Sequence, residues 1–179
     1  MRIPLLAAIS LLSATLAWAE PVSEVSSDLD GDGSAEIFRL TGQEDGDADL
    51  VIDTDRWQLI IKDFVWHGAG FGQEASLALA PNGSVQVMSM NESIGRNRWR
   101  LTLTIAYRDQ AYRVAGYTFT WYDTLDLENS GNCDVNLLSG KGLLALGDKD
   151  PEPIRVTWGA VKITDWTHVP VWEGPCEQR

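Results

Sequence analysis

Residues 99–122 read WRLTLTIAYRDQAYRVAGYTFTWY and set the fold class of the chain. From residue 99 to residue 107, large apolar side chains alternate with arginine, threonine and alanine, which is typical of a strand with one apolar and one wet face. Residues 108–111, Arg-Asp-Gln-Ala, have the composition of a turn, and residues 112–122 continue as a second strand rich in aromatic side chains. The pattern therefore predicts a long antiparallel β-hairpin.

The same period of two recurs along most of the chain. Residues 77–80 and 85–90 flank Pro81-Asn82-Gly83-Ser84, where Asn-Gly is a strong hairpin signal. Further strands are expected over residues 36–40, 50–52, 57–65, 135–138, 143–146, 154–158 and 161–165. About ten strands in hairpin order predict an all-β domain, an antiparallel meander sandwich or barrel. The alternative is a small propeller-like sheet assembly, although a full propeller needs more strands.

The first nineteen residues are typical of a signal peptide. Arg2 supplies a positive charge, residues 3–12 are mostly apolar, and Ala17-Trp18-Ala19 matches a cleavage pattern, with cleavage after Ala19. The apolar run is too short to span a bilayer, and no later segment approaches about twenty apolar residues. The sequence thus predicts a single mature domain over residues 20–179, periplasmic or secreted, without a membrane span.

The charge and the cysteines fit that compartment. The chain has 14 basic and 26 acidic residues, a net charge of −12, which disfavours nucleic acid and anionic lipid as partners. Its two cysteines are Cys133 and Cys176. Because an oxidising compartment favours disulfides over free thiols, we expect these two residues to be paired.

Residues 28–36, DLDGDGSAE, read as a loop that holds calcium. Carboxylates at every second position of a tight turn converge on one point, and Ca²⁺ takes six to eight oxygen ligands at about 2.3 to 2.6 Å. Gly33 permits the positive-φ bend that turns the next carbonyl inward. The predicted ligands are Asp28, Asp30, Asp32, the carbonyl of Ser34 and Glu36.

The loop is not an EF-hand, because the position that needs a bidentate glutamate is Arg39. Residues 27–37 resemble instead the short calcium loop of FG-GAP and VCBS-type repeats, in which D-x-D-x-D-G-x-x-[DE] leads into a strand. This resemblance implies an extracellular β-sheet adhesion or binding module. The chain has one clear copy, so neither a propeller nor an adhesive role follows from it.

A second acidic run covers residues 44–49 and contains Asp45, Asp47 and Asp49. Leu50 occupies the place where the bending glycine should be. We therefore expect a solvated loop, with a single ligand lent to the first site or a weak second ion as alternatives.

The residues that could carry catalysis are few. Hydrolase motifs such as G-x-S-x-G and H-E-x-x-H are missing, and only His67 and His168 could act as bases near neutral pH. His67 lies in the glycine-rich segment 65–72, where we expect a surface loop residue. The sequence therefore favours a protein that is not an enzyme.

Aromatic side chains are the better indication of binding. Tyr117, Phe119 and Trp121 fall on one face of one strand and form a possible surface for a protein or glycan ligand of the cell envelope. The sequence thus predicts an exported calcium-binding β domain that acts as a non-catalytic binding module. The alternatives are a small carboxylate-dependent glycan hydrolase and a periplasmic inhibitor or immunity protein.

Overall fold

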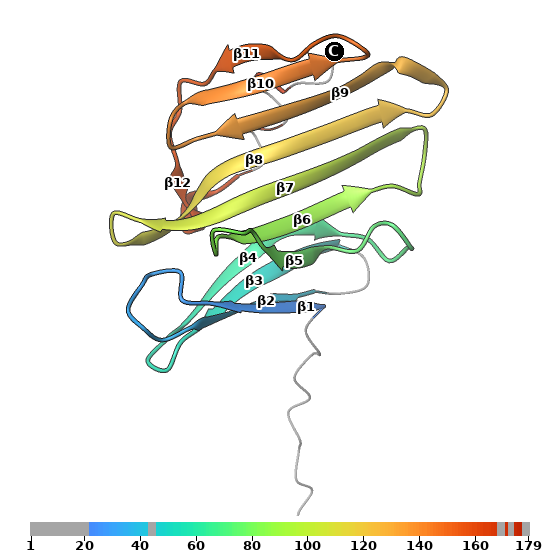
Figure 1. Ribbon diagram of the computed structural model, residues 1–179. Coiled ribbons are helices and arrows are strands. Elements are labelled where there is room, and N and C mark those ends of the chain that lie inside the picture. Colours follow the sequence, from blue (N-terminus) through green and yellow to red (C-terminus); the bar gives the residue numbers. More distant parts are fainter. Residues whose placement is uncertain (1–21, 43–45, 168–170, 172–173, 177–179) are drawn as a thin grey trace, which may run out of the picture.

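The computed structural model describes residues 22–42, 46–167, 171 and 174–176, so the predicted signal peptide lies outside the described residues. The described chain folds into two antiparallel sheets (Figure 1). The first sheet has the order β1-β2-β3-β4, and the second has the order β11-β10-β9-β8-β7-β6-β5, with β12 paired to β8. Within each sheet, the strands from β1 to β4 and from β5 to β11 therefore lie side by side in chain order, and only β12 departs from it. The predicted all-β meander is confirmed.

The four-stranded sheet contains β1 (Ser23–Ser27), β2 (Glu36–Thr41), β3 (Gly46–Asp53) and β4 (Gln58–His67). The eight-stranded sheet contains β5 (Ser76–Leu79), β6 (Val85–Asn91), β7 (Asn97–Arg108), β8 (Ala111–Asp123), β9 (Asp126–Asn136), β10 (Lys141–Leu146), β11 (Glu152–Arg155) and β12 (Val161–Lys162). A short 3-10 helix, η1 (Ile163–Asp165), follows β12.

The predicted hairpin is the centre of the larger sheet. Strands β7 and β8 pair along their whole length, with Trp99 opposite Trp121 and Tyr107 opposite Tyr112. Asp109 and Gln110 in the connecting turn have φ angles of 49° and 58°. Two consecutive left-handed residues match the twist of the strands that they join, which is the property of a tight β-hairpin turn.

The two sheets pack against each other and share one hydrophobic core. Phe38 and Leu50 of the smaller sheet belong to the same buried cluster as Val87, Leu103 and Phe119 of the larger sheet. The smaller sheet lies against the β5–β6 end of the larger one (Figure 1). The described strands form two layered sheets and no closed barrel, so the sandwich alternative describes the fold and the propeller alternative does not.

Described residues of the carboxyl-terminal part of the chain pack in the core beside the larger sheet. Cys133 of β9 forms a disulfide with Cys176, with a Cα–Cα distance of 5.5 Å, and both residues are completely buried. Ile163 and Val171 are buried in the same core. The predicted disulfide is therefore confirmed, and it ties the carboxyl-terminal segment to the sheet.

The strand bounds differ from the predicted ones in several places, and residues 46–49, which were expected in a solvated loop, belong to β3. Strand β9 begins at Asp126, whereas the predicted strand begins at residue 135. Most of its first residues are exposed, so no apolar alternation marks them, and the strand is held by pairing with β8 and β10. Strand β1 was not predicted, and segment 161–165 has only two strand residues before η1. Among the described residues, no helix has the length and apolar character needed to cross a bilayer.

Candidate functional sites

The predicted calcium loop connects β1 to β2 and gathers three carboxylates. One oxygen each of Asp28, Asp30 and Asp32 lies within 4.8 Å of the others. Backbone N–H groups orient them: Asp32 donates to Asp30 Oδ1 at 2.9 Å, and Gly33 donates to Asp28 Oδ2 at 3.1 Å. Gly33 has a φ of 93°, so the expected left-handed bend is present. This group of oxygens could hold a metal ion.

One of these carboxylates is ion-paired to a side chain of the chain itself. Arg56, in the β3–β4 connection, contacts Asp32 Oδ2 through its guanidinium group. The Arg56 side chain is 75% exposed, so it can leave this contact at little cost. The guanidinium group therefore offsets part of the loop's negative charge but is not fixed at Asp32.

Glu36 makes different contacts from those expected of a metal ligand. It is 2% exposed, and its two oxygens accept hydrogen bonds from the N–H of Leu29 at 2.7 Å and from the hydroxyl of Tyr112 at 2.6 Å. Burial, together with this bond to the carboxylate, raises the pKa of Tyr112 well above its usual value of 10. Glu36 thus lies outside the group of three aspartates, and ligation by Glu36 or Ser34 stays a prediction.

Among its described residues, the second acidic run forms no comparable group of carboxylates. Asp45 lies outside the described residues. Asp49 accepts hydrogen bonds from the N–H of Asp63 and from the ammonium group of Lys62. Asp47 is exposed and faces a different site, described below.

The prediction of a ligand surface at Tyr117, Phe119 and Trp121 is wrong. These side chains are 1%, 0% and 5% exposed, respectively, and all three belong to the core. The alternation shows correctly that they share a face, but the face is the inner one. In the β7–β8 register they lie opposite Leu103, Leu101 and Trp99 of β7, respectively, which line the same core.

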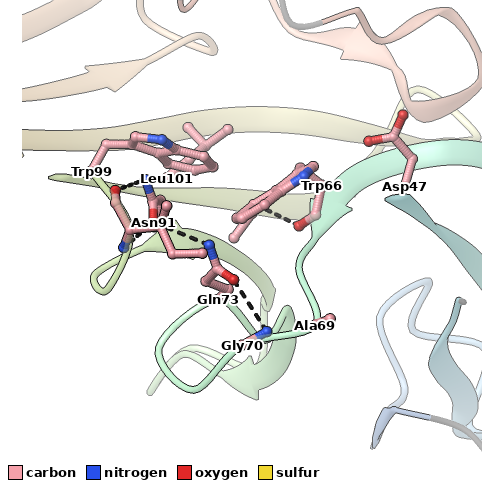
Figure 2. Close-up of a pocket in the computed structure, with 10 residues that line it drawn as sticks. Asp47, Trp66, Ala69, Gly70, Gln73, Asn91, Trp99 and Leu101 are labelled. Atoms are coloured by element: carbon pink, nitrogen blue, oxygen red, sulfur yellow. Dashed lines mark hydrogen bonds between the residues drawn. The ribbon is translucent and has the colours of Figure 1, made fainter. Parts of the chain in front are cut away.

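Further along this inner face the structure opens into a cleft of about 790 Å³ (Figure 2). We call it the Trp66–Trp99 cleft. Its lining residues come from both sheets and two loops: Asp47, Trp66, Ala69, Gly70, Gln73, Ser89, Asn91, Ile94, Trp99 and Leu101. The volume falls within the range of about 300 to 1,000 Å³ usual for small-molecule sites.

The pairing of the strands shows which lining residues lie on each wall of the cleft. In the β6–β7 pair, Asn91 is opposite Trp99 and Ser89 is opposite Leu101, so these four side chains share the inner face of the larger sheet. In the β3–β4 pair, Asp47 is opposite Trp66. The hydroxyl of Ser89 donates to the carbonyl of Trp66 at 2.6 Å and joins the two walls. The cleft therefore lies where β4 meets β6 and β7.

The loop between β4 and β5 lines one side of the cleft and is held by internal hydrogen bonds. The side chain of Gln73 is 5% exposed and accepts from the N–H of Gly70 at 3.1 Å. At the base of the loop, Nδ1 of His67 accepts from the N–H of Ala75 at 2.9 Å. His67 ends β4 and is 9% exposed, which corrects the prediction of a surface loop residue.

Asn91 supports the second loop at the cleft. Its amide donates to the carbonyl of Ile94 at 2.8 Å, and its Oδ1 accepts from the N–H of Ile94 at 3.0 Å. Gln73 also donates to Asn91 Oδ1 at 3.3 Å. The N–H of Glu92 donates to the carbonyl of Gly72 at 2.8 Å, so both loops form one connected rim.

The sequence signal for this cleft was weak. Trp99 lies in the predicted hairpin, but Trp66 lies in the glycine-rich segment 65–72, which was expected to be a loop. Their rings meet only because the two sheets pack at this point, with centroids 5.6 Å apart. No family model matches the chain, and neither a curated protein nor a solved structure is significantly similar to it.

Proposed function

We propose that the chain is an exported, calcium-binding β domain that binds a cell-envelope ligand without converting it, and that this ligand occupies the Trp66–Trp99 cleft. The observation that carries the proposal is the pair of tryptophan rings in a cleft of about 790 Å³. Binding sites of this size combine aromatic walls with a few oriented polar groups. The cleft therefore replaces the strand face around Trp121 as the proposed ligand-binding surface.

Calcium is the ion that best suits the acidic loop. Its converging groups are carboxylate oxygens, which hard divalent cations prefer, and the bent loop suits the flexible coordination of Ca²⁺ better than the strict octahedron of Mg²⁺. Asp28, Asp30 and Asp32 would supply the charge. The ion would have a structural role and fix the conformation of the loop, as the resemblance to FG-GAP and VCBS-type loops implies.

The proposed location rests on the disulfide. The Cys133–Cys176 bond fits an oxidising compartment outside the cytoplasm. The amino-terminal segment adds the export signal expected from its sequence.

The described lining of the cleft supports binding more than hydrolysis. Glycan hydrolysis by carboxylates uses two of them, about 5 to 9.5 Å apart, across the bond to be cleaved. Among the described residues that line the cleft, Asp47 supplies a single carboxylate. The hydrolase alternative would therefore need a second acid from outside this set.

The test is retention of cell-envelope material by the immobilised mature protein. Solubilised glycans and proteins from a Gram-negative envelope are passed over wild type, Trp66→Ala and Trp57→Ala, and the retained fractions are compared by mass spectrometry. Trp57 is 43% exposed and precedes β4 at the end opposite Trp66, so it is the matched control. We expect wild type and Trp57→Ala to retain the same species unchanged in mass, and Trp66→Ala to lose them. Equal retention by all three proteins, or release of cleaved products, would contradict the proposal.

A further inference from the structure

The two tryptophan rings of the cleft form a continuous surface. The ring centroids of Trp66 and Trp99 are 5.6 Å apart, and the ring planes are inclined at 52°. At this separation the rings touch each other, so no ligand group fits between them. A ligand would therefore lie across both rings, on a bent aromatic shelf.

A charged acceptor flanks this shelf. Figure 2 shows Trp99, Trp66 and Asp47 in a row, with the Gln73 side chain below. Asp47 and Trp66 are directly opposite in the β3–β4 register, so their side chains share one face. No ion pair among the described residues involves Asp47, and this residue is exposed. It is available to accept hydrogen bonds from a ligand.

The remaining polar groups of the cleft use part of their hydrogen-bonding capacity within the protein. The amide of Asn91 is used in holding its own loop. Gln73 donates one amide hydrogen to Asn91 Oδ1, and its second amide hydrogen can bond to a ligand. The Ser89 hydroxyl donates to the backbone carbonyl of Trp66, and its oxygen can still accept a hydrogen bond. The cleft thus offers a strong acceptor and a few weaker donors and acceptors around a wide apolar shelf.

These features match a saccharide. A pyranose ring presents a face of C–H groups that packs on aromatic rings, and its hydroxyls at the ring edge donate to carboxylates. An anionic ligand is disfavoured, because the charged residue among the described lining is an aspartate and the chain carries a net charge of −12. An organic cation is less suited to contacting rings, because aromatic cages surround the cation instead of forming a shelf. A cleft of about 790 Å³ is also far larger than an ammonium group.

We propose that the Trp66–Trp99 cleft binds an uncharged oligosaccharide, with sugar rings stacked on Trp66 and Trp99 and hydroxyl groups donating to Asp47. This inference rests on the proposed binding function and specifies its ligand class. Selectivity arises from Asp47, which accepts from neutral hydroxyls and repels carboxylates and sulfates. The two loops joined by the Glu92–Gly72 hydrogen bond, which carry the exposed Ile94 and Phe71, form the margin of the site.

The test is titration calorimetry of the mature protein with defined probes. The uncharged probes are maltotriose, cellotriose, mannotriose and chitotriose, the anionic probe is trigalacturonate, and the cationic probe is tetramethylammonium. We expect at least one uncharged trisaccharide to bind and the two charged probes to bind more weakly. Trp66→Ala should lower the affinity about 5- to 140-fold, the factor that corresponds to 1 to 3 kcal/mol if stacking on a nucleobase sets the scale.

Two further variants make the result specific. Asp47→Asn keeps the size of the side chain and removes its charge. It should weaken binding of the uncharged sugar and reduce the difference in affinity between this sugar and trigalacturonate. Trp57→Ala should bind as wild type does, and thermal unfolding of each variant verifies its fold.

Several outcomes would overturn the inference, and they separate it from the proposed function. If no uncharged trisaccharide binds but envelope material is retained in a Trp66-dependent way, the ligand class is wrong and the binding function stands. Preference for tetramethylammonium would assign the cleft to organic cations. If a trisaccharide binds equally to wild type and Trp66→Ala, the cleft is not the site, and both proposals about it are wrong.

Discussion

The hydroxyl of Tyr112 donates a 2.6 Å hydrogen bond to Oε1 of Glu36, which lies 76 residues earlier in the chain. Both side chains are buried, at 7% and 2% exposure, respectively. The other oxygen of Glu36 accepts from the N–H of Leu29 in the acidic loop. The β7–β8 hairpin is thereby connected through one carboxylate to the backbone of the candidate calcium loop.

Substitution of Tyr112 by phenylalanine should destabilise the domain by about 1.5 to 3 kcal/mol, the range for hydrogen bonds to charged groups. The ring remains in place, but the buried Glu36 carboxylate loses a donor. Urea denaturation monitored by circular dichroism measures the change. Tyr107→Phe is the matched control, because the Tyr107 ring contacts Tyr112 with centroids 5.0 Å apart. Equal losses in both variants would show that the Glu36 bond has no special importance.

Chelator-stripped protein should bind one calcium ion, because Asp28, Asp30 and Asp32 place their oxygens together. Titration calorimetry should show one site in wild type and none in Asp30→Asn. At a hundred times the dissociation constant, the ion should add about 2.7 kcal/mol to the free energy of unfolding. Asp49→Asn, in the second acidic run, should bind normally. A second site in wild type that is lost in Asp49→Asn would instead assign an ion to the second run.

The sequence predicted the strands far better than the sites. Alternation of apolar and polar residues from 99 to 107 and from 112 to 122 identifies a hairpin, because the period of two is a local property of the backbone. The same alternation cannot tell which face another sheet will cover. Tyr117, Phe119 and Trp121 were therefore assigned correctly to one face and wrongly to the surface.

The cleft was beyond sequence reasoning for the same reason. Asp47, Gln73 and Trp99 lie on separate segments of the chain, and they meet only because β4 packs beside β6 and β7. The acidic loop is the opposite case. Its three aspartates are neighbours in sequence, so their convergence is dictated locally. The bond between Glu36 and Tyr112 could not be predicted, because the two residues are distant in sequence.

Stability should fall at alkaline pH, partly because burial raises the pKa of Tyr117 to about 12. Tyrosine in the unfolded chain ionises near pH 10. The buried neutral hydroxyl thus contributes its full stability below about pH 10 and loses it as the pH rises from about 10 to 12. Tyr117→Phe should flatten this part of the curve of unfolding free energy against pH. An unchanged slope would show that Tyr117 does not control the alkaline limb and would direct attention to Tyr112.

Removal of the disulfide in the double variant Cys133→Ala/Cys176→Ala should cost up to about 4 kcal/mol, from loop-closure entropy over a separation of 43 residues. Both sulfur atoms are buried, so alanine also leaves small cavities. Urea denaturation of oxidised wild type, reduced wild type and the double variant separates the two effects. If reduction alone leaves stability unchanged, the bond does not contribute through the unfolded state.

The last prediction concerns Gly131, which lies opposite Trp121 in the β8–β9 register. A Cβ atom at Gly131 would lie 2.2 Å from Cζ2 of the Trp121 indole, a distance that no side chain tolerates. The indole cannot easily move, because it is 5% exposed and stacks on Phe119 at 5.4 Å. Gly131→Ala should therefore destabilise the domain by about 1 to 3 kcal/mol.

A double-mutant cycle tests the cause of this loss. Trp121→Phe shortens the ring, so Gly131→Ala should cost much less in the Trp121→Phe background, with a coupling energy above about 0.5 kcal/mol. Asn132→Ala, at the exposed neighbouring position, is the control for substitution in β9. Additive losses in the cycle would show that the Trp121 ring is not what requires glycine at position 131.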